Sequence, residues 1–162
     1  METIRTALET NNINIKLEDL INKFTEYYSI IAPDTEKQII TEETLNYLRS
    51  KYNLCIITGR PRHFYSLIWE DRFKKYFKYT VCQGDFKNIA RKPEPDIIIK
   101  TIEKYNLDAD YYIGNDRKDI IATKKANLKS ICVIHTEKDK NLLIDIGCDI
   151  VIDNINDLVN IF

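Results

Sequence analysis

From Leu54 onward the chain alternates between short apolar runs typical of strands and segments with helical periodicity. The runs are continuous and include β-branched residues, as in strands that are buried on both faces of a parallel sheet. Their ranges are Leu54–Ile57, Tyr79–Cys82, Tyr111–Gly114, Ser130–His135 and Asp149–Ile152. The alternation predicts an α/β fold in which helices cover both faces of a parallel sheet.

The first third of the chain predicts helices. Thr3–Glu9 and Leu17–Ile31 carry apolar residues at helical spacing, and Pro33 is expected to break the second helix. Thr41 is followed by two glutamates, so it predicts the N-cap of a third helix.

Composition excludes several classes of function. A formal charge of -1 over 162 residues argues against non-specific nucleic-acid binding. The amino terminus lacks the apolar core of a signal peptide, and no apolar run reaches transmembrane length. The four cysteines are far apart and form no CxxC pair: Cys55, Cys82, Cys132 and Cys148. We therefore expect buried thiols at Cys55 and Cys132, and a reducing cytoplasmic location.

Polar residues gather at three junctions downstream of predicted strands: Thr58-Gly59-Arg60, Arg91-Lys92-Pro93 and Gly114–Asp119. In a parallel sheet, such junctions meet at the carboxyl edge of the strands. A hydroxyl with backbone N–H groups can hold phosphate oxygens, a lysine can neutralise them, and acids can hold a hard cation. The three junctions together predict a phosphate and magnesium site.

Each of these residues also has an ordinary structural role open to it. Thr58 could be a helix N-cap, Lys92 a solvated lysine, and Asp119 the N-cap of a helix over Ile120–Ala126. The order and spacing of the three junctions favour the site over these separate roles.

Several stretches resemble the haloacid dehalogenase-like hydrolases. IITGRPR is similar to their second motif, RKPEPDII to their third, YYIGNDRKDIIATKKAN to their fourth, and CDIVIDNINDL to their last strand and helix. The similarity covers Glu42–Phe162, and Ile4–Phe24 resembles the start of a helical cap. The resemblance implies a Rossmann-like sheet, with a cap-like helical segment over 1–40 and an α/β core over 41–162.

The resemblance also implies roles at the first two junctions. Thr58 matches the phosphate-binding hydroxyl, with the backbone N–H of Gly59 and then Arg60 beside it. Lys92 matches the lysine that balances charge between the nucleophile and the phosphate. Thr58 and Lys92 are therefore the implied catalytic residues, and all four residues are implied to bind phosphate.

At the third junction the resemblance implies a Mg²⁺ site. Asn115 stands where the family usually has a magnesium-binding aspartate, and Asp119 matches its second acid. Asp116 is close enough to substitute. An amide oxygen can still ligate Mg²⁺, but one negative charge is lost.

The family's first motif, Asp-x-Asp at the end of its first strand, has no counterpart here. It supplies the nucleophile and the general acid and base. Asp19 lies in a helical pattern, Asp34 follows Pro33, and Asp153 lacks a second aspartate at the right spacing. We expect the chain to begin just after the nucleophile strand and to lack the covalent route on its own.

Loss of that strand has a structural consequence. In the resembling fold it lies between Leu54–Ile57 and Tyr111–Gly114. Those two strands must then pair directly, or the amino-terminal residues, a second copy or a partner chain must fill the groove, because unpaired backbone groups are costly.

Three functions follow from these patterns. The first is a non-catalytic relative that binds a small phosphorylated ligand or acts as an interaction module. The second is a magnesium-dependent phosphohydrolase of a small phosphorylated metabolite, with its nucleophile strand supplied by an upstream segment or a partner chain. The third, a Rossmann-like domain with an unrelated anion, leaves the three ordered motifs unexplained.

Overall fold

The computed structural model describes residues 15–162, so the predicted helix at Thr3–Glu9 lies outside the described residues. The helices are α2 (Leu17–Thr35), α3 (Glu42–Lys51), α4 (Arg62–Ile68), α5 (Glu70–Phe73), α6 (Asp96–Tyr105), α7 (Arg117–Lys125), α8 (Glu137–Asp145), η1 (Ile155–Asp157) and α9 (Leu158–Ile161). The strands are β1 (Cys55–Pro61), β2 (Tyr79–Gln83), β3 (Tyr111–Gly114), β4 (Lys129–Val133) and β5 (Ile150–Ile152). The predicted alternation of strands and helices is confirmed.

The described strands form two parallel sheets rather than one. β1 pairs with β2, and regular pairing ends where Thr58 lies opposite Cys82. The other sheet has the order β3-β4-β5, with both pairs parallel. Among residues 15–162, β1 and β3 each have one neighbour, so the expectation that they could pair directly is wrong.

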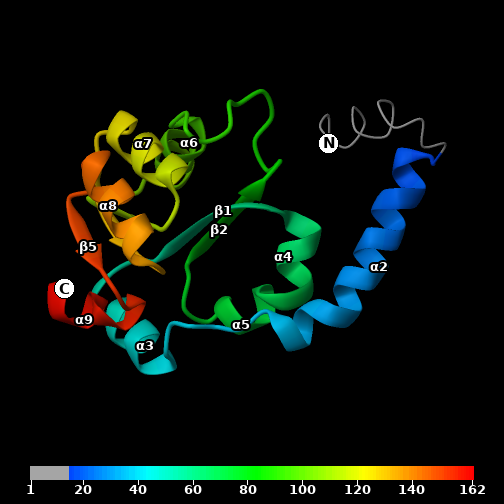
Figure 1. The fold of residues 1–162 in the computed structure, drawn as a ribbon, viewed down its shortest axis with the longest axis horizontal. Helices are drawn as coiled ribbons and strands as arrows, with labels where there is room; N and C mark the ends of the chain where they lie inside the picture. Colours follow the sequence, from blue (N-terminus) through cyan, green and yellow to red (C-terminus); the bar gives the residue numbers. More distant parts are fainter. Residues whose placement is uncertain (1–14) are drawn as a thin grey trace.

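Helices cover both faces of the strands, as predicted (Figure 1). Successive residues of a strand point to opposite faces. Ile131 in β4 packs with Leu48 of α3 and Leu158 of α9. Its neighbour Cys132 packs instead with Ile120 of α7 and residues of α8. These side chains are almost fully buried, and each leucine or isoleucine among them stabilises the fold by roughly 1.5–3 kcal/mol.

Helix α2 continues past Pro33, so the predicted break there is wrong. Proline removes one helical hydrogen bond, but the end of α2 is fixed by contacts beyond it. The carboxylate of Glu36 accepts hydrogen bonds from Arg60 at 2.8 Å, Trp69 Nε1 at 2.8 Å and the Tyr28 hydroxyl at 2.6 Å. We call these four residues the Glu36 latch.

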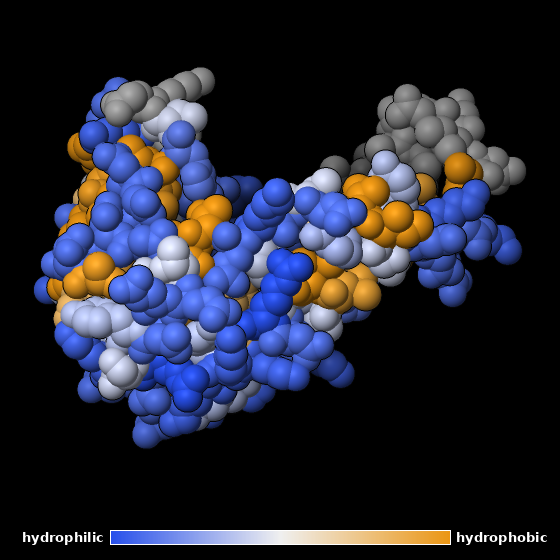
Figure 2. Space-filling model, turned by 90° about the horizontal axis from the view of Figure 1, so that it is seen from below, coloured by the Kyte–Doolittle hydropathy of each residue, from blue (hydrophilic) through white to orange (hydrophobic). Residues whose placement is uncertain are grey.

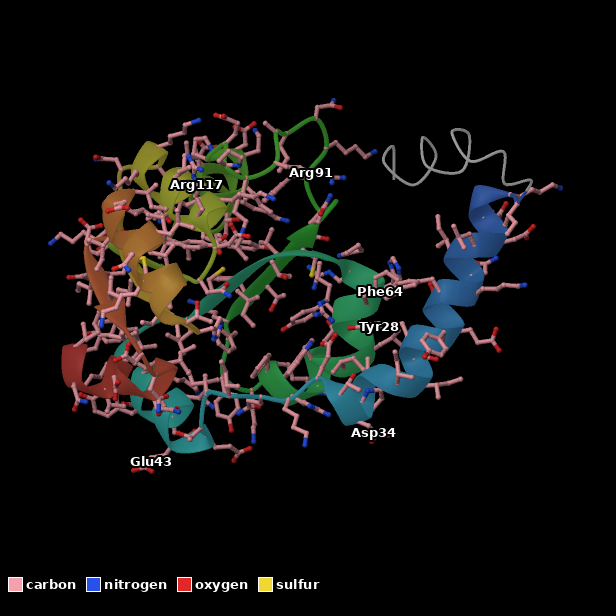
Figure 3. The ribbon with its side chains drawn as sticks, in the orientation of Figure 1. Tyr28, Asp34, Glu43, Phe64, Arg91 and Arg117 are labelled. Atoms are coloured by element: carbon pink, nitrogen blue, oxygen red, sulfur yellow. A yellow bond between two sulfur atoms is a disulfide. The ribbon has the colours of Figure 1, made fainter. Side chains whose placement is uncertain are left out.

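Outside the latch, α2 is an arm that packs mainly on α4 (Figure 1). Figure 3 shows Tyr28 and Phe64 between the two helices, and their rings are 4.9 Å apart. Figure 2 shows hydrophobic side chains gathered on this arm, where Phe24, Tyr27 and Ile30 are more than half exposed.

None of the helices within residues 15–162 is long and apolar enough to span a membrane.

Thr41 caps α3 as predicted, because its hydroxyl accepts a hydrogen bond from the backbone N–H of Thr44 at 3.2 Å. The cysteines behave differently from the prediction. Cys132 and Cys148 form a disulfide, with Cα atoms 6.4 Å apart, so the expected free thiol at Cys132 is wrong. The pairing of β4 with β5 brings the two cysteines together. Cysteine usage therefore gives no support for a reducing compartment.

Candidate phosphate-binding site

A pocket of about 720 Å³ lies where β1 and β3 end, within the size range of small-molecule sites. All three predicted junctions line it. Thr58 and Gly59 come from β1, Lys92 from the loop before α6, and the segment from Gly114 to Asp119 from the turn between β3 and α7. The structure therefore brings the predicted junctions to one place.

Thr58 presents its side chain where the regular pairing of β1 stops. Its Oγ1 accepts a hydrogen bond from the backbone N–H of Arg60 at 3.1 Å, which leaves the hydroxyl proton free to donate. It does not cap a helix, because the N-cap of α4 is Pro61. A Cβ placed on Gly59 would meet no atom within 4 Å, so a ligand can approach the backbone closely there.

Arg60 is not brought into this pocket. Its guanidinium forms an ion pair with Glu36 and also contacts the Tyr28 hydroxyl. In this arrangement Arg60 holds α2 rather than facing the position expected for a phosphate.

Lys92 lies at the centre of a half-enclosed polar cluster. Its Nζ donates to Asp119 Oδ1 at 2.5 Å and to the Tyr112 hydroxyl at 3.1 Å. The side chains of Lys92 and Asp119 are 18% and 12% exposed, so Lys92 is not a freely solvated lysine. Burial alone would lower the pKa of Lys92, but Tyr112 and Asp119 outweigh it and raise the pKa above its ordinary value.

The acidic loop before α7 is a capping box. Asp116 is the N-cap and accepts from the backbone N–H of Lys118 at 2.9 Å, while Asp119 Oδ2 faces the backbone N–H of Asp116 at 3.4 Å. Asp119 is thus the third helical residue, not the N-cap. Gly114 is required by this packing, since a Cβ there would lie 2.6 Å from the Cβ of Asp119.

The side chains of the three predicted metal ligands each contact a different partner and do not face one another. Asp119 is bound to Lys92, Asp116 caps α7, and the Asn115 amide nitrogen lies 3.2 Å from His135 Nε2. Within residues 15–162, no three His, Cys, Asp or Glu side chains gather as a metal site. Magnesium binding by this trio stays a prediction.

Three residues of the site were missed by the sequence analysis. Tyr112 was predicted only as part of a strand, and the structure shows it half-buried with its hydroxyl 3.1 Å from Lys92 Nζ. His135 carried no signal beyond its place after β4. Gln83 links two junctions: with its amide oriented to donate to the Gly59 carbonyl at 2.6 Å, it accepts from Arg91 at 2.7 Å.

The carboxylates that line the pocket are Asp116 and Asp119. Both come from the α7 side, and both are engaged, one with the helix backbone and one with Lys92. Among the pocket-lining residues there is no third carboxylate to act as a nucleophile.

Fold and site together define an open parallel α/β domain with a polar pocket at its strand ends. A family model described as haloacid dehalogenase-like hydrolase matches residues 2–133, which is most of the chain. The chain belongs to this family, and the resemblance seen in its motifs is confirmed.

Two relatives with assigned activities are phosphatases. Pyrophosphatase PpaX of Oceanobacillus iheyensis is 24% identical over 123 residues, covering 74% of this chain and 56% of the relative. A phosphoglycolate phosphatase of Pseudomonas fluorescens is 21% identical over 150 residues, covering 90% of this chain and 54% of the relative. The chain spans about half the length of these curated relatives.

Solved structures show the same fold. A phosphonoacetaldehyde hydrolase-like protein of Oleispira antarctica aligns with a TM-score of 0.73 and 15% identity, covering 97% of this chain and 68% of that one. CbbY of Rhodobacter sphaeroides, solved in complex with phosphate, aligns with a TM-score of 0.70 and 14% identity, covering 90% and 67%.

Proposed function

We propose that this chain binds a small phosphorylated molecule through its phosphate group and does not hydrolyse it by a covalent route on its own. One observation carries the proposal. The pocket brings the Thr58 hydroxyl and the Lys92 ammonium together, while both carboxylates that line it are already engaged. Such a site can hold an anion but offers no free carboxylate to attack phosphorus.

The charges of the pocket favour an anionic ligand. Its charged lining residues are Arg91, Lys92, Lys118, Asp116 and Asp119, three cations against two anions. An ammonium has three protons to donate, and Lys92 uses two of them on Asp119 and Tyr112. The third can reach a phosphate oxygen. Because the pKa of Lys92 is raised, it stays protonated throughout the neutral range.

The ligand class comes from the relatives. Phosphatases named for phosphoglycolate and pyrophosphate match this chain, so both compounds are reasonable ligands besides inorganic phosphate. The proposal is for recognition of the phosphate group. The remainder of the ligand would contact the parts of the pocket lined by Phe86 and Ile89.

A second function has one observation in its favour. The chain would be part of a magnesium-dependent phosphohydrolase if a further strand, carrying the attacking carboxylate, completed the sheet. The separation of β1 from β3 supports this alternative, because each is an edge strand beside the pocket. Both functions predict no turnover by the chain alone, so hydrolysis that appears only after a segment carrying the attacking carboxylate is added would support the second function.

Calorimetric titration with inorganic phosphate, 2-phosphoglycolate and pyrophosphate, each with and without Mg²⁺, tests the proposal. We expect saturable binding by the chain and a loss of about 10- to 100-fold in affinity for Lys92→Met, as hydrogen bonds to charged groups contribute about 1.5–3 kcal/mol. Thr58→Val should weaken binding in the same direction. Dichroism spectra confirm that each variant is folded.

Lys87→Met is the matched control, because Lys87 is exposed and does not line the pocket. It should bind phosphate as the unaltered chain does. Absence of binding by the unaltered chain, or equal losses for Lys87→Met and Lys92→Met, would contradict the proposal.

A further inference from the structure

Arg91 is a cation that lines the pocket without an acidic partner. It lies on the loop between β2 and α6, near the end of β2 (Figure 3). Within residues 15–162, no carboxylate forms an ion pair with its guanidinium, whereas Lys92 in the same pocket is paired with Asp119. This side of the pocket therefore has a positive charge that is free to meet an anion.

A neutral amide fixes the direction of this guanidinium. With its amide oriented as described above, Gln83 accepts a hydrogen bond from Arg91 Nε at 2.8 Å and another from Arg91 Nη2 at 2.7 Å. The same amide donates to the carbonyl oxygen of Gly59 at 2.6 Å, and Gly59 follows Thr58 in the chain. One amide group therefore joins Arg91 to the strand end that presents the Thr58 hydroxyl.

The remaining donors of Arg91 match a carboxylate. A guanidinium has five N–H groups, and in Arg91 one on Nε and one on Nη2 are directed at Gln83. The second proton of Nη2 and one proton of Nη1 lie parallel along the outer edge of the group. This is the edge that binds both oxygens of a carboxylate. Among residues 15–162 no acceptor occupies it.

A carboxylate suits the charge of this part of the pocket better than a second phosphate group does. A carboxylate brings one negative charge, which a single guanidinium matches, while a phosphate ester brings about −1.5 to −2 at neutral pH. The pocket lining has an excess of one cation over its acids. A ligand with one phosphate and one carboxylate therefore leaves less negative charge unmatched than a diphosphate does.

We propose that Arg91 binds the carboxylate of a phosphorylated carboxylic acid whose phosphate group lies at Thr58 and Lys92. The inference rests on the proposed phosphate binding and narrows it to a class of ligand. The carboxylate accepts two parallel hydrogen bonds from the outer edge of the guanidinium. Gln83 is a positioning residue, because it holds that edge in place without neutralising it.

Calorimetric titration of the full chain with 2-phosphoglycolate and with ethyl phosphate tests the proposal. The two compounds have the same length, and a methyl group replaces the carboxylate in the second. We expect the chain to prefer 2-phosphoglycolate by about tenfold or more, because paired hydrogen bonds between charged groups are among the strongest in proteins. Arg91→Met should bind the two compounds equally and keep most of its affinity for ethyl phosphate.

Two further variants separate direction from charge. Arg91→Lys keeps the charge but loses the planar edge, so it should recover only part of the preference. Gln83→Leu keeps the arginine but frees its orientation, so it should also reduce the preference. Because Arg91 is exposed and Gln83 is half-buried, dichroism spectra are needed mainly for the Gln83 variant.

Lys118→Met is the matched control, because Lys118 is an exposed cation that also lines the pocket. Its loss should weaken the binding of both compounds to the same degree and leave the preference unchanged. A preference that persists in Arg91→Met, or that disappears in Lys118→Met, would overturn the proposal.

The outcomes also separate this inference from the proposed function. Equal affinities of the unaltered chain for the two compounds would overturn the carboxylate site and leave phosphate binding standing. Binding of neither compound would overturn both. Pyrophosphate binding that is tighter than that of 2-phosphoglycolate and is lost in Arg91→Met would make a second phosphate group the ligand of Arg91, against the proposal.

Discussion

Lys92 and Asp119 form the best-enclosed ion pair recorded in residues 15–162, and the site depends on their contact. Removing one partner leaves a largely buried charge without compensation. For Lys92→Met we expect a loss of about 2–4 kcal/mol in the free energy of unfolding, somewhat below the range for fully buried pairs. Denaturant titration measures it.

Lys125→Met provides the comparison for that variant. Lys125 pairs with Glu94 at 2.6 Å, but both side chains are more than 40% exposed. Exposed pairs contribute about 0–1 kcal/mol, so the change should be small. Equal losses for the two lysine variants would show that the enclosure of Lys92 has no energetic consequence.

Gly114 fixes the approach of β3 to α7. Gly114→Ala places a Cβ 2.6 Å from the Cβ of Asp119, which is held by the helix and cannot swing away. We expect a loss of about 1–3 kcal/mol in stability from overpacking. Gly59→Ala meets no neighbour and should leave stability unchanged or slightly higher. Thermal unfolding of the two variants compares them directly, and the reverse order would disprove this packing argument.

For single residues, the sequence predicted part of the site. Thr58, Lys92 and Asp119 could be placed at one site because each follows a strand and parallel strands end at one edge. The turn of Arg60 toward Glu36 could not be foreseen, because it depends on where α2 packs. The contact of Lys92 with Tyr112 was missed because it depends on how the loop before α6 packs against β3.

The Glu36 latch determines how α2 is held. Burial alone would raise the pKa of Glu36, but the hydrogen bonds from Arg60, Tyr28 and Trp69 outweigh it and lower the pKa below 4.5. A carboxyl with a depressed folded pKa contributes its stability above its unfolded pKa and loses it as pH falls through the folded value. We therefore expect α2 to loosen below about pH 4.5.

Glu36→Gln should remove that pH dependence and speed hydrogen exchange in the second half of α2 at neutral pH. Glu26→Gln is the control, because Glu26 is exposed on the same helix. Exchange followed by mass spectrometry separates the two. Unchanged exchange in Glu36→Gln would show that the ring contacts with Phe64 hold the helix without the latch.

The disulfide ties Cys132 near the end of β4 to Cys148, two residues before β5. Cys132 and Cys148 are 16 residues apart, and closing a loop of this size stabilises a fold by about 3 kcal/mol. Reduction should lower the free energy of unfolding by about this amount. The Cys148→Ser variant should already have the lower free energy of unfolding, and the reductant should not change it. An unchanged unfolding curve on reduction would contradict the assignment.

For helices and strands, the hydrophobic periodicity predicted the elements well where their positions depend on residues close together in the chain. Asp96–Tyr105 is helical over the predicted range, and all predicted strands form. The continuation of α2 past Pro33 was not predicted, because the latch that holds its end joins residues far apart in the chain. The disulfide escaped prediction because it needs the order of strands in the sheet, which spacing alone does not supply.

For the whole molecule, the alternation of strands and helices predicted the fold class, and the missing motif predicted a missing strand. The structure shows the arrangement without that strand: β1 and β2 form one sheet, β3, β4 and β5 form another, and β1 does not pair with β3. Apolar residues of α6 and α7 pack against both sheets and hold them to one core. The patterns in the sequence do not show that the two sheets share this core. The division of residues 1–40 from 41–162 stays a prediction.

Hydrolysis of p-nitrophenyl phosphate by the purified chain with Mg²⁺ tests the central claim most directly. If the chain keeps a phosphate pocket without an attacking carboxylate, it should bind phosphate and show no turnover above the rate without protein. Turnover by the chain alone that is abolished in Asp119→Asn and retained in the exposed-site variant Lys87→Met would contradict the account.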